Sequence, residues 1–148
     1  MRLILNILWL VLGGLELAVA WILFGVVMFV TIVGIPWGRS CITLAKLAVW
    51  PFGNDAVRRD DLTGREDIGT GALGFVGNVI WFLLAGLWLA IAHALLALAF
   101  FITIIGIPFG VAHWRLARLA LAPIGKDVVS IETRDALAAR RSPPPIPR

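Results

Sequence analysis

The sequence predicts an all-α integral membrane protein that consists of two tandem, pseudo-symmetric helical modules. Three observations lead to this fold class: two long segments almost without charge, a block of about 52 residues that occurs twice, and glycine-proline motifs at matching positions in both copies. Each module is expected to contain a long or hairpin membrane segment, followed by an amphipathic helix that lies in the membrane interface.

Apolar residues dominate the chain. Of its 148 residues, 60% are hydrophobic, whereas about 45–50% is usual for a globular domain. Within residues 3–33 the only ionisable side chain is Glu16, and within residues 69–109 the only one is His93. Both windows exceed the about 18 apolar residues that indicate a membrane-spanning helix. Membrane embedding is therefore expected for both halves of the chain.

The second observation is an internal repeat with an offset of 72 residues, from Gly34 to Gly106. The string Gly-Ile-Pro-Trp-Gly at residues 34–38 recurs as Gly-Ile-Pro-Phe-Gly at residues 106–110, and the match continues without a gap on both sides. Because many matched positions hold Gly, Pro, Asn, Asp or Trp, apolar composition alone does not explain the match. The matched pairs include Asn6 with Asn78, Trp9 with Trp81, Gly14 with Gly86, Pro51 with Pro123 and Asp55 with Asp127.

The repeat and the charge distribution divide the chain into four parts. Residues 1–57 form the first module, 58–72 a polar linker, 73–129 the second module and 130–148 a polar tail. A short helix is expected over residues 132–141, followed by an extended, Pro-rich end over residues 142–148. The small residues at 18–20 resemble a signal-peptide cleavage site, but the second copy has the same pattern far from the N-terminus. The first segment is therefore expected to be retained.

The length of the first apolar segment leaves its path open. As one helix, residues 3–33 would be about 46 Å long, more than one hydrocarbon core of about 30 Å and less than two. A single tilted helix, a span preceded by a short interfacial helix, and a shallow hairpin all fit, and Gly13-Gly14 offers a turn or kink. Proline then breaks the helix at the repeated motif. The break positions are Gly34, Pro36, Gly38, Gly106, Pro108 and Gly110.

A basic amphipathic helix is expected after each motif. Arg39, Thr43 and Lys46 recur at helical spacing, and Arg115 and Arg118 take the places of Thr43 and Lys46 in the second copy. A basic helix that also carries Trp is typical of the membrane interface. Because the two helices are alike, both are expected on the cytoplasmic side together with the C-terminus, which requires an even number of crossings per module. Inverted modules are the alternative.

Four polar side chains inside the apolar segments are candidate functional residues. Glu16 is a functional-site candidate, or it marks a water-exposed turn. His93 could form a proton relay or ion site with Glu16, or it is a hydrogen-bonded packing residue. Asn6 and Asn78 are expected to join the modules through amide hydrogen bonds between helices.

The repeated motifs resemble those of a known family. Asn-x-x-Trp, Gly-Ile-Pro-x-Gly, Leu-Ala and Pro-x-Gly-x-Asp-x-Val, each present twice, are similar to the YccF family of bacterial inner-membrane proteins, over residues 1 to about 135. The resemblance implies an inner-membrane location and two copies of a membrane domain, and it brings no catalytic residues. Val111-Ala112 replaces Arg39-Ser40 in the second copy, so the modules are not interchangeable.

These features favour a noncatalytic inner-membrane component that packs as an accessory subunit, in a homo-oligomer or with a larger transport partner in the lipid bilayer. The alternative is a small ion- or proton-coupled transporter or channel that uses Glu16 and His93. We expect no enzymatic activity and no cofactor, because no nucleophile with its base is recognised. We expect no metal site, because His93 and His113 are too few and too scattered. Nucleic acid is not an expected partner, because the net charge of +4 comes from Lys and Arg that flank the apolar segments.

Overall fold

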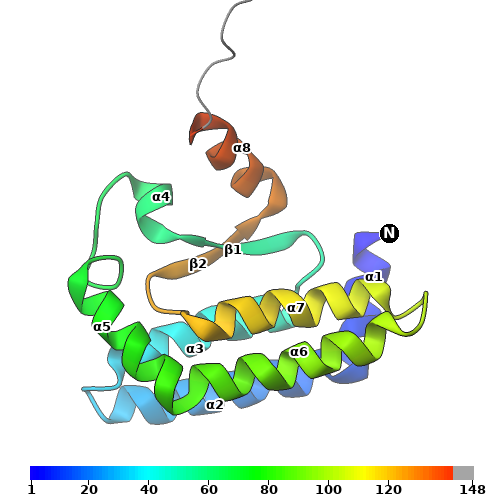
Figure 1. Ribbon diagram of the computed structural model, residues 1–148, viewed down its shortest axis with the longest axis horizontal. Helices are drawn as coiled ribbons and strands as arrows, with labels where there is room; N and C mark the ends of the chain where they lie inside the picture. The colour runs from blue at the N-terminus through cyan, green and yellow to red at the C-terminus, as the bar shows by residue number, and fades with distance from the viewer. Residues whose placement is uncertain (142–148) are drawn as a thin grey trace, which may run out of the picture.

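The computed structural model describes residues 1–141, so the Pro-rich end predicted over residues 142–148 lies outside the described residues. Two long, bent helices are each followed by a shorter helix that runs antiparallel to it, and a two-stranded sheet lies above the shorter helices (Figure 1). In chain order the elements are α1 (Arg2–Trp9), η1 (Leu10–Gly14), α2 (Leu15–Val30), α3 (Ile35–Val49), β1 (Asn54–Arg58), α4 (Arg59–Thr63), α5 (Ala72–Trp81), η2 (Phe82–Gly86), α6 (Leu87–Phe101), α7 (Ile107–Leu121), β2 (Lys126–Ser130) and α8 (Ile131–Arg141).

Each module begins with a long, bent helical segment. Elements α1, η1 and α2 make up the first, over Arg2–Val30, where Gly13 breaks the helix, and α5, η2 and α6 make up the second, over Ala72–Phe101. Both are long and apolar enough to cross a membrane, judged by length and composition alone. Both contain a π-helical turn, and in the first copy Gly13 adopts a φ of 126° within it. The kink predicted at Gly13-Gly14 is confirmed, and in the first copy it separates the short helix α1 from the longer helix α2.

A tight turn joins each long helix to the next. The first long helix ends at Val30, so the break lies just before the Gly-Ile-Pro motif rather than within it. Pro36 lies in the first turn of α3, where a missing N–H removes no helical hydrogen bond. The Gly34 amide donates to Thr31 Oγ1 at 3.1 Å, and the second copy repeats this bond at 3.0 Å. The motif therefore starts the returning helix.

The returning helices α3 and α7 form the core of the protein. Leu44 and Leu47 of α3 are fully buried, as are Leu116 and Leu119 of α7. The prediction that these helices lie in the membrane interface stays a prediction. Apolar side chains cover more than half of each helix, so each one packs against its long helix, its counterpart and the sheet.

The sheet relates the two modules by a pseudo-twofold axis. Strand β1 pairs with β2 in antiparallel register, with Ala56 opposite Val128, and these two residues are equivalent in the repeat. The axis therefore passes between them and perpendicular to the sheet, so that equivalent parts of both modules lie at the same depth beneath it. The two strands correct the all-α prediction. They were missed because each has only five residues and its partner is distant in the sequence.

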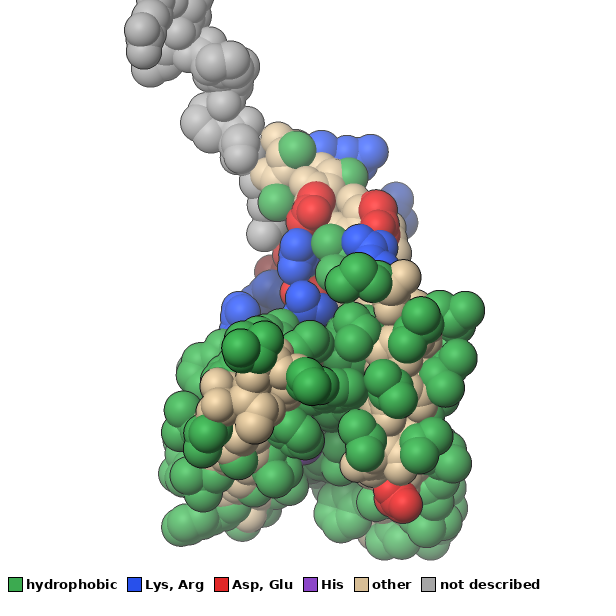
Figure 2. All heavy atoms as spheres, turned by 90° about the vertical axis from the view of Figure 1, so that its right-hand side faces the viewer, with side chains coloured by type: hydrophobic (Ala, Val, Ile, Leu, Met, Phe, Trp, Pro, Cys, Tyr) green, Lys and Arg blue, Asp and Glu red, His purple; other side chains and the backbone are tan. Residues whose placement is uncertain are grey.

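Most charged side chains lie at one end of this axis, and apolar side chains cover the rest. Figure 2 shows hydrophobic side chains covering the helical body, while Lys, Arg, Asp and Glu gather over the sheet and α8. We call the charged part, residues 54–71 and 126–141, the polar cap. The helix predicted over residues 132–141 is confirmed as α8 (Figure 1). The hairpin turns are apolar and exposed, with 76% of Ile32 and 88% of Ile104 accessible.

Candidate functional site

Each candidate asparagine holds the closing turn of its own module. The Asn6 amide donates to the Phe52 carbonyl at 2.9 Å and accepts from the Phe52 amide at 3.0 Å. Asn78 makes the same two bonds with Ile124, both at 3.0 Å. The expectation that these amides join one module to the other is therefore wrong. The closing turns leave backbone groups without a helical partner, and an asparagine in the first helix can satisfy both groups at once.

The same arrangement surrounds the π-helical turn of each module. Trp9 Nε1 donates to the Ala48 carbonyl, and Trp81 Nε1 donates to the Ala120 carbonyl at 2.7 Å. Both indole rings are buried. A Cβ on Gly14 would collide with the Trp9 ring, so the glycine leaves room for the tryptophan to reach its acceptor. These polar side chains hold the backbone in place.

The structure brings His93 and His113 together inside the second module. Their Nδ1 atoms lie 3.1 Å apart, so one imidazole donates to the other, and both side chains are buried. His113 also packs between two rings: Trp9 of the first module at 5.0 Å and Phe100 at 5.4 Å. The view that the two histidines are too scattered to meet is wrong. They lie on either side of a hairpin, equally far from its turn at Thr103.

A cavity of about 290 Å³ adjoins the histidine pair where the two modules meet. Trp9 and Gly13 line it from the first module, and His93, Phe109 and His113 line it from the second. Two imidazoles are fewer than the three or four ligands of a zinc site, and among residues 1–141 no third His, Cys, Asp or Glu joins them. What the pair can do chemically is share or pass one proton between two ring nitrogens.

Glu16 does not form the pair with His93 that the sequence suggested. Among the described residues, Glu16 has no hydrogen-bond or ion-pair partner, and its side chain is exposed on the apolar body. It follows the kink at Gly13 by three residues instead of lying in a hairpin turn. Its carboxylate therefore faces outward from the module that carries it.

The counterparts of the histidine pair in the first module are Trp21 and Cys41. Both are buried, and the Trp21 ring lies 6.4 Å from the ring of Trp81. Among the described residues, the Trp21 indole N–H has no partner. The two copies therefore differ in chemistry at this position, and within residues 1–141 only the second copy has a pair of imidazoles here that can exchange a proton.

The basic residues expected to bind headgroups divide into two groups. Lys46 and Arg115 bind the opposite module: Lys46 Nζ lies 3.0 Å from Asp127 Oδ1, and Arg115 donates to the carbonyls of Pro51 and Asn54 at 3.2 and 3.1 Å. The side chains of Arg39 and Arg118 are exposed. Within the described part of the chain, neither guanidinium has a hydrogen-bond or ion-pair partner, so both remain available to other ligands.

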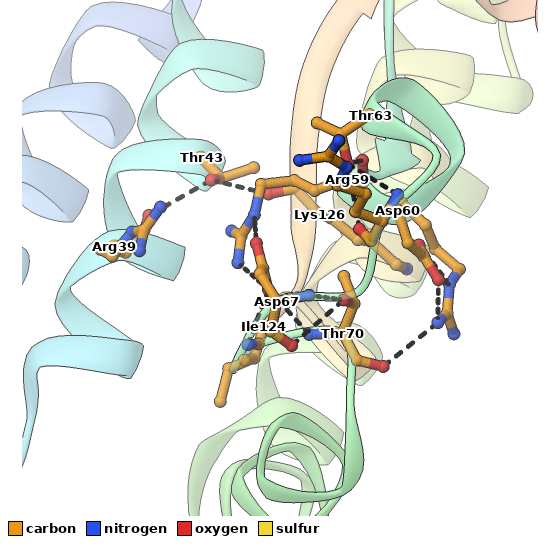
Figure 3. A network of polar contacts seen from close by, with 12 residues as sticks. Arg39, Thr43, Arg59, Asp60, Thr63, Asp67, Thr70, Ile124 and Lys126 are labelled. Atoms are coloured by element: carbon orange, nitrogen blue, oxygen red, sulfur yellow. Dashed lines mark hydrogen bonds and ion pairs between the residues drawn. The ribbon is translucent and has the colours of Figure 1, made fainter.

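The loop before α5 is ordered by a second ion pair. Arg59 donates to both carboxylate oxygens of Asp67, at 2.7 and 2.9 Å, as Figure 3 shows. The Asp67 carboxylate also accepts from the amides of Gly69 and Thr70. The guanidinium of Arg59, together with these amides, holds the pKa of Asp67 below its usual range. This loop fixes Arg59 above the start of α3.

Sequence comparisons agree with the repeat and with the membrane assignment. A family model described as the inner membrane component domain, YccF, matches residues 4–54 and again residues 76–126, which are separated by the offset of the repeat. Two relatives, both named inner membrane protein YccF, come from Escherichia coli (strain K12) and Shigella flexneri. Each is 40% identical over 146 residues, which cover 95% of this chain and 99% of the relative. No solved structure matches the chain.

Proposed function

Because the chain belongs to the YccF family of inner-membrane proteins, we propose that it is a noncatalytic component of that membrane, and that both modules insert from the same side. The observation that carries this proposal is the pseudo-twofold axis that passes between Ala56 and Val128, with most of the charge at one end and apolar surface at the other. Its exposed apolar helices then serve to pack against lipid and against another membrane subunit or a second copy.

The contacts at the ends of each module support insertion from one side. The first module starts at the polar cap, because Arg2 binds Glu132 of α8 at 2.6 Å, and it ends there in β1. The second module likewise starts after the cap loop and ends in β2. A chain that leaves and returns to the same side makes an even number of crossings.

The direction of the returning helices favours re-entrant hairpins over full crossings. Helices α3 and α7 run across the pseudo-twofold axis beneath the sheet, rather than along it (Figure 1). The exposed isoleucines in the hairpin turns then lie within the bilayer, where an apolar side chain is favourable. The Lys and Arg of the polar cap favour the cytoplasmic side for the cap.

Labelling of single cysteines tests this topology. In a Cys41→Ala background, Glu66→Cys and Ala136→Cys place thiols on the two halves of the cap, and Ile104→Cys places one in a hairpin turn. We expect a membrane-impermeant maleimide to label both cap positions only from the cytoplasmic side, and the turn position only after detergent is added. Cap positions that react on opposite sides would refute insertion from one side, and a turn that reacts from the periplasm would refute re-entrant hairpins.

Association tests the role as a component. After extraction in mild detergent, blue-native electrophoresis is expected to show the chain in a species larger than its monomer. A lone monomer across several detergents and native lipid extracts would count against an accessory subunit. The buried polar side chains support the absence of catalysis, since Asn6, Asn78, Trp9 and Trp81 bind backbone groups.

A proton-coupled transporter is the second candidate, and the hydrogen bond between His93 and His113 beside a cavity favours it. Flux measurements in liposomes separate the two proposals. If the pair carries protons, His93→Ala should abolish a pH-driven flux that the matched variant Glu16→Gln leaves intact, because only the histidine faces the cavity. Unchanged flux in both variants, or no flux in the wild type, leaves the noncatalytic component as the better proposal.

A further inference from the structure

Two cavities of different chemistry meet at Arg39 and Arg59. The first, of about 450 Å³, is mainly apolar and lies between the start of α3 and helix α5. The second, of about 270 Å³, lies over α3 and is lined by Thr43 and Lys46. Both arginines line both cavities. A ligand with a charged end and an apolar end could therefore occupy the two together.

The charged end of this site is cationic. Lys46 and Lys126 join the two arginines in lining the polar cavity, against the single carboxylate of Asp127. Figure 3 shows the Arg59 side chain reaching toward α3, where Arg39 and Thr43 lie. Arg59 uses Nε and Nη2 to bind Asp67, and the Arg39 guanidinium has no described partner.

The apolar end opens toward the lipid side of the protein. Trp37 forms its inner wall and is fixed there by a hydrogen bond from Nε1 to the Gly77 carbonyl at 3.3 Å. Leu73, Val76 and Ile80 of α5 form the opposite wall, and each is exposed. The cavity size is within the about 300–1,000 Å³ typical of sites for small ligands.

We propose that this site binds one anionic phospholipid, with its phosphate on Arg39 and Arg59 and an acyl chain along Trp37. The Arg39 guanidinium can match phosphate oxygens through paired, charge-assisted hydrogen bonds, and Arg59 can add Nη1, because its Nε and Nη2 bind Asp67. The apolar cavity adjoins the exposed apolar face of α5, and the arginines stand at the boundary with the polar cap. Charge complementarity favours an anionic lipid over a zwitterionic one, because the four cations outnumber the two carboxylates, Asp67 and Asp127, that pair with them.

The repeat indicates that the site occurs once. The position equivalent to Arg39 is Val111, and the position equivalent to Arg59 is Ile131. Both arginines are therefore replaced by apolar residues on the other side of the pseudo-twofold axis, where the same backbone would otherwise form a second copy. Valine at the equivalent position also shows that the returning helix accepts this side chain.

Fluorescence quenching in vesicles tests the proposal with the full-length chain. The signal of Trp37 is obtained by comparing the wild type with Trp37→Phe, and phospholipids with brominated acyl chains quench it on contact. We expect phosphatidylglycerol to quench Trp37 at a lower mole fraction than phosphatidylcholine does. Arg39→Val should reduce this preference about fivefold, the effect of one cation near an anionic lipid. Arg118→Val is the matched control, since this exposed arginine lies on α7 outside both cavities, and it should keep the preference.

The outcomes separate the site from its alternatives. If Arg118→Val lowered the preference for phosphatidylglycerol as much as Arg39→Val does, the preference would come from the general surface charge, and the proposal would be overturned. A wild type without lipid preference would overturn it as well. Binding of inorganic phosphate that depends on Arg39 in detergent, without quenching of Trp37 by brominated acyl chains in vesicles, would assign the arginines to free phosphate, which also overturns it. Arg39→Lys keeps the charge without the paired donors, so partial retention of the preference supports the phosphate contact even if the valine variant fails to fold. The result does not depend on which side of the membrane the cap faces.

Discussion

Replacing Asn6 by alanine should destabilise the first module more than the equivalent change does in the second. The substitution removes hydrogen bonds of 2.9 and 3.0 Å and leaves the Phe52 amide and carbonyl without partners. Side-chain hydrogen bonds in membrane proteins contribute about 0.6–1.7 kcal/mol each, so losing two of them costs about 1–3 kcal/mol of unfolding free energy. Asn6 is 0% exposed, so water cannot replace either bond.

Asn78→Ala provides the matched comparison, because it removes the same two bonds from Ile124. Asn78 is only partly buried, so water can satisfy some of what is lost and the destabilisation should be smaller. Reversible unfolding in mixed micelles, followed by circular dichroism at increasing dodecyl sulfate, measures both. The reasoning fails if Asn6→Ala unfolds like the wild type, or if Asn78→Ala is the more damaging change.

Two further predictions concern the bend and the cap. Gly14→Ala should cost about 1–3 kcal/mol in the same assay, because its Cβ would displace the Trp9 ring from its carbonyl acceptor, while Gly71→Ala meets only ordinary contacts and should be near neutral. In a carbon-detected NMR titration, the Asp67 carboxyl should titrate below the unfolded value of about 3.9, and Arg59→Gln should raise its midpoint. Because the folded-state pKa is lowered, the stabilisation from this pair is present above about pH 3.9 and is lost as the pH falls through the lower folded-state value; a midpoint unchanged by Arg59→Gln would contradict the assignment.

The sequence was sufficient for the parts of the fold that depend on local pattern. The offset of the repeat identified both modules, hydropathy located both long helices, and Gly13 marked the kink. The strands were missed because the partner of Asp55 lies on the other copy, and no local pattern reports a pairing across that distance. The burial of α3 and α7 was not predicted because their basic residues indicated helices at the protein surface. In the structure, Lys46 and Arg115 lie on the side of these helices that faces the polar cap, and most of the other residues of these helices are buried.

The sequence identified the polar residues of the candidate site but not which residues contact one another. His93 was identified from its apolar surroundings, yet its partner was sought in Glu16 because both are ionisable. A geometric signal was available: in a helical hairpin, residues equally distant from the turn face each other, and His93 and His113 are each ten positions from Thr103. For the asparagines the repeat was the useful signal. An amide at the same position in both copies indicates a hydrogen bond that each module makes within itself, here to the backbone of its closing turn.

A duplicated module under a twofold axis therefore separates two kinds of residue. Positions that serve one module alone keep the same residue in both copies, as Asn6 and Asn78 do when each binds the closing turn of its own module. Positions that face the other module need not match, because the two sides of the axis can specialise once the fold is secured. Two differences between the copies belong to this second class. The histidine pair takes the positions of Trp21 and Cys41, and Val111 takes the position of Arg39. Both differences are therefore the places where one copy can be tested for binding or proton transfer that the other lacks the side chains to perform.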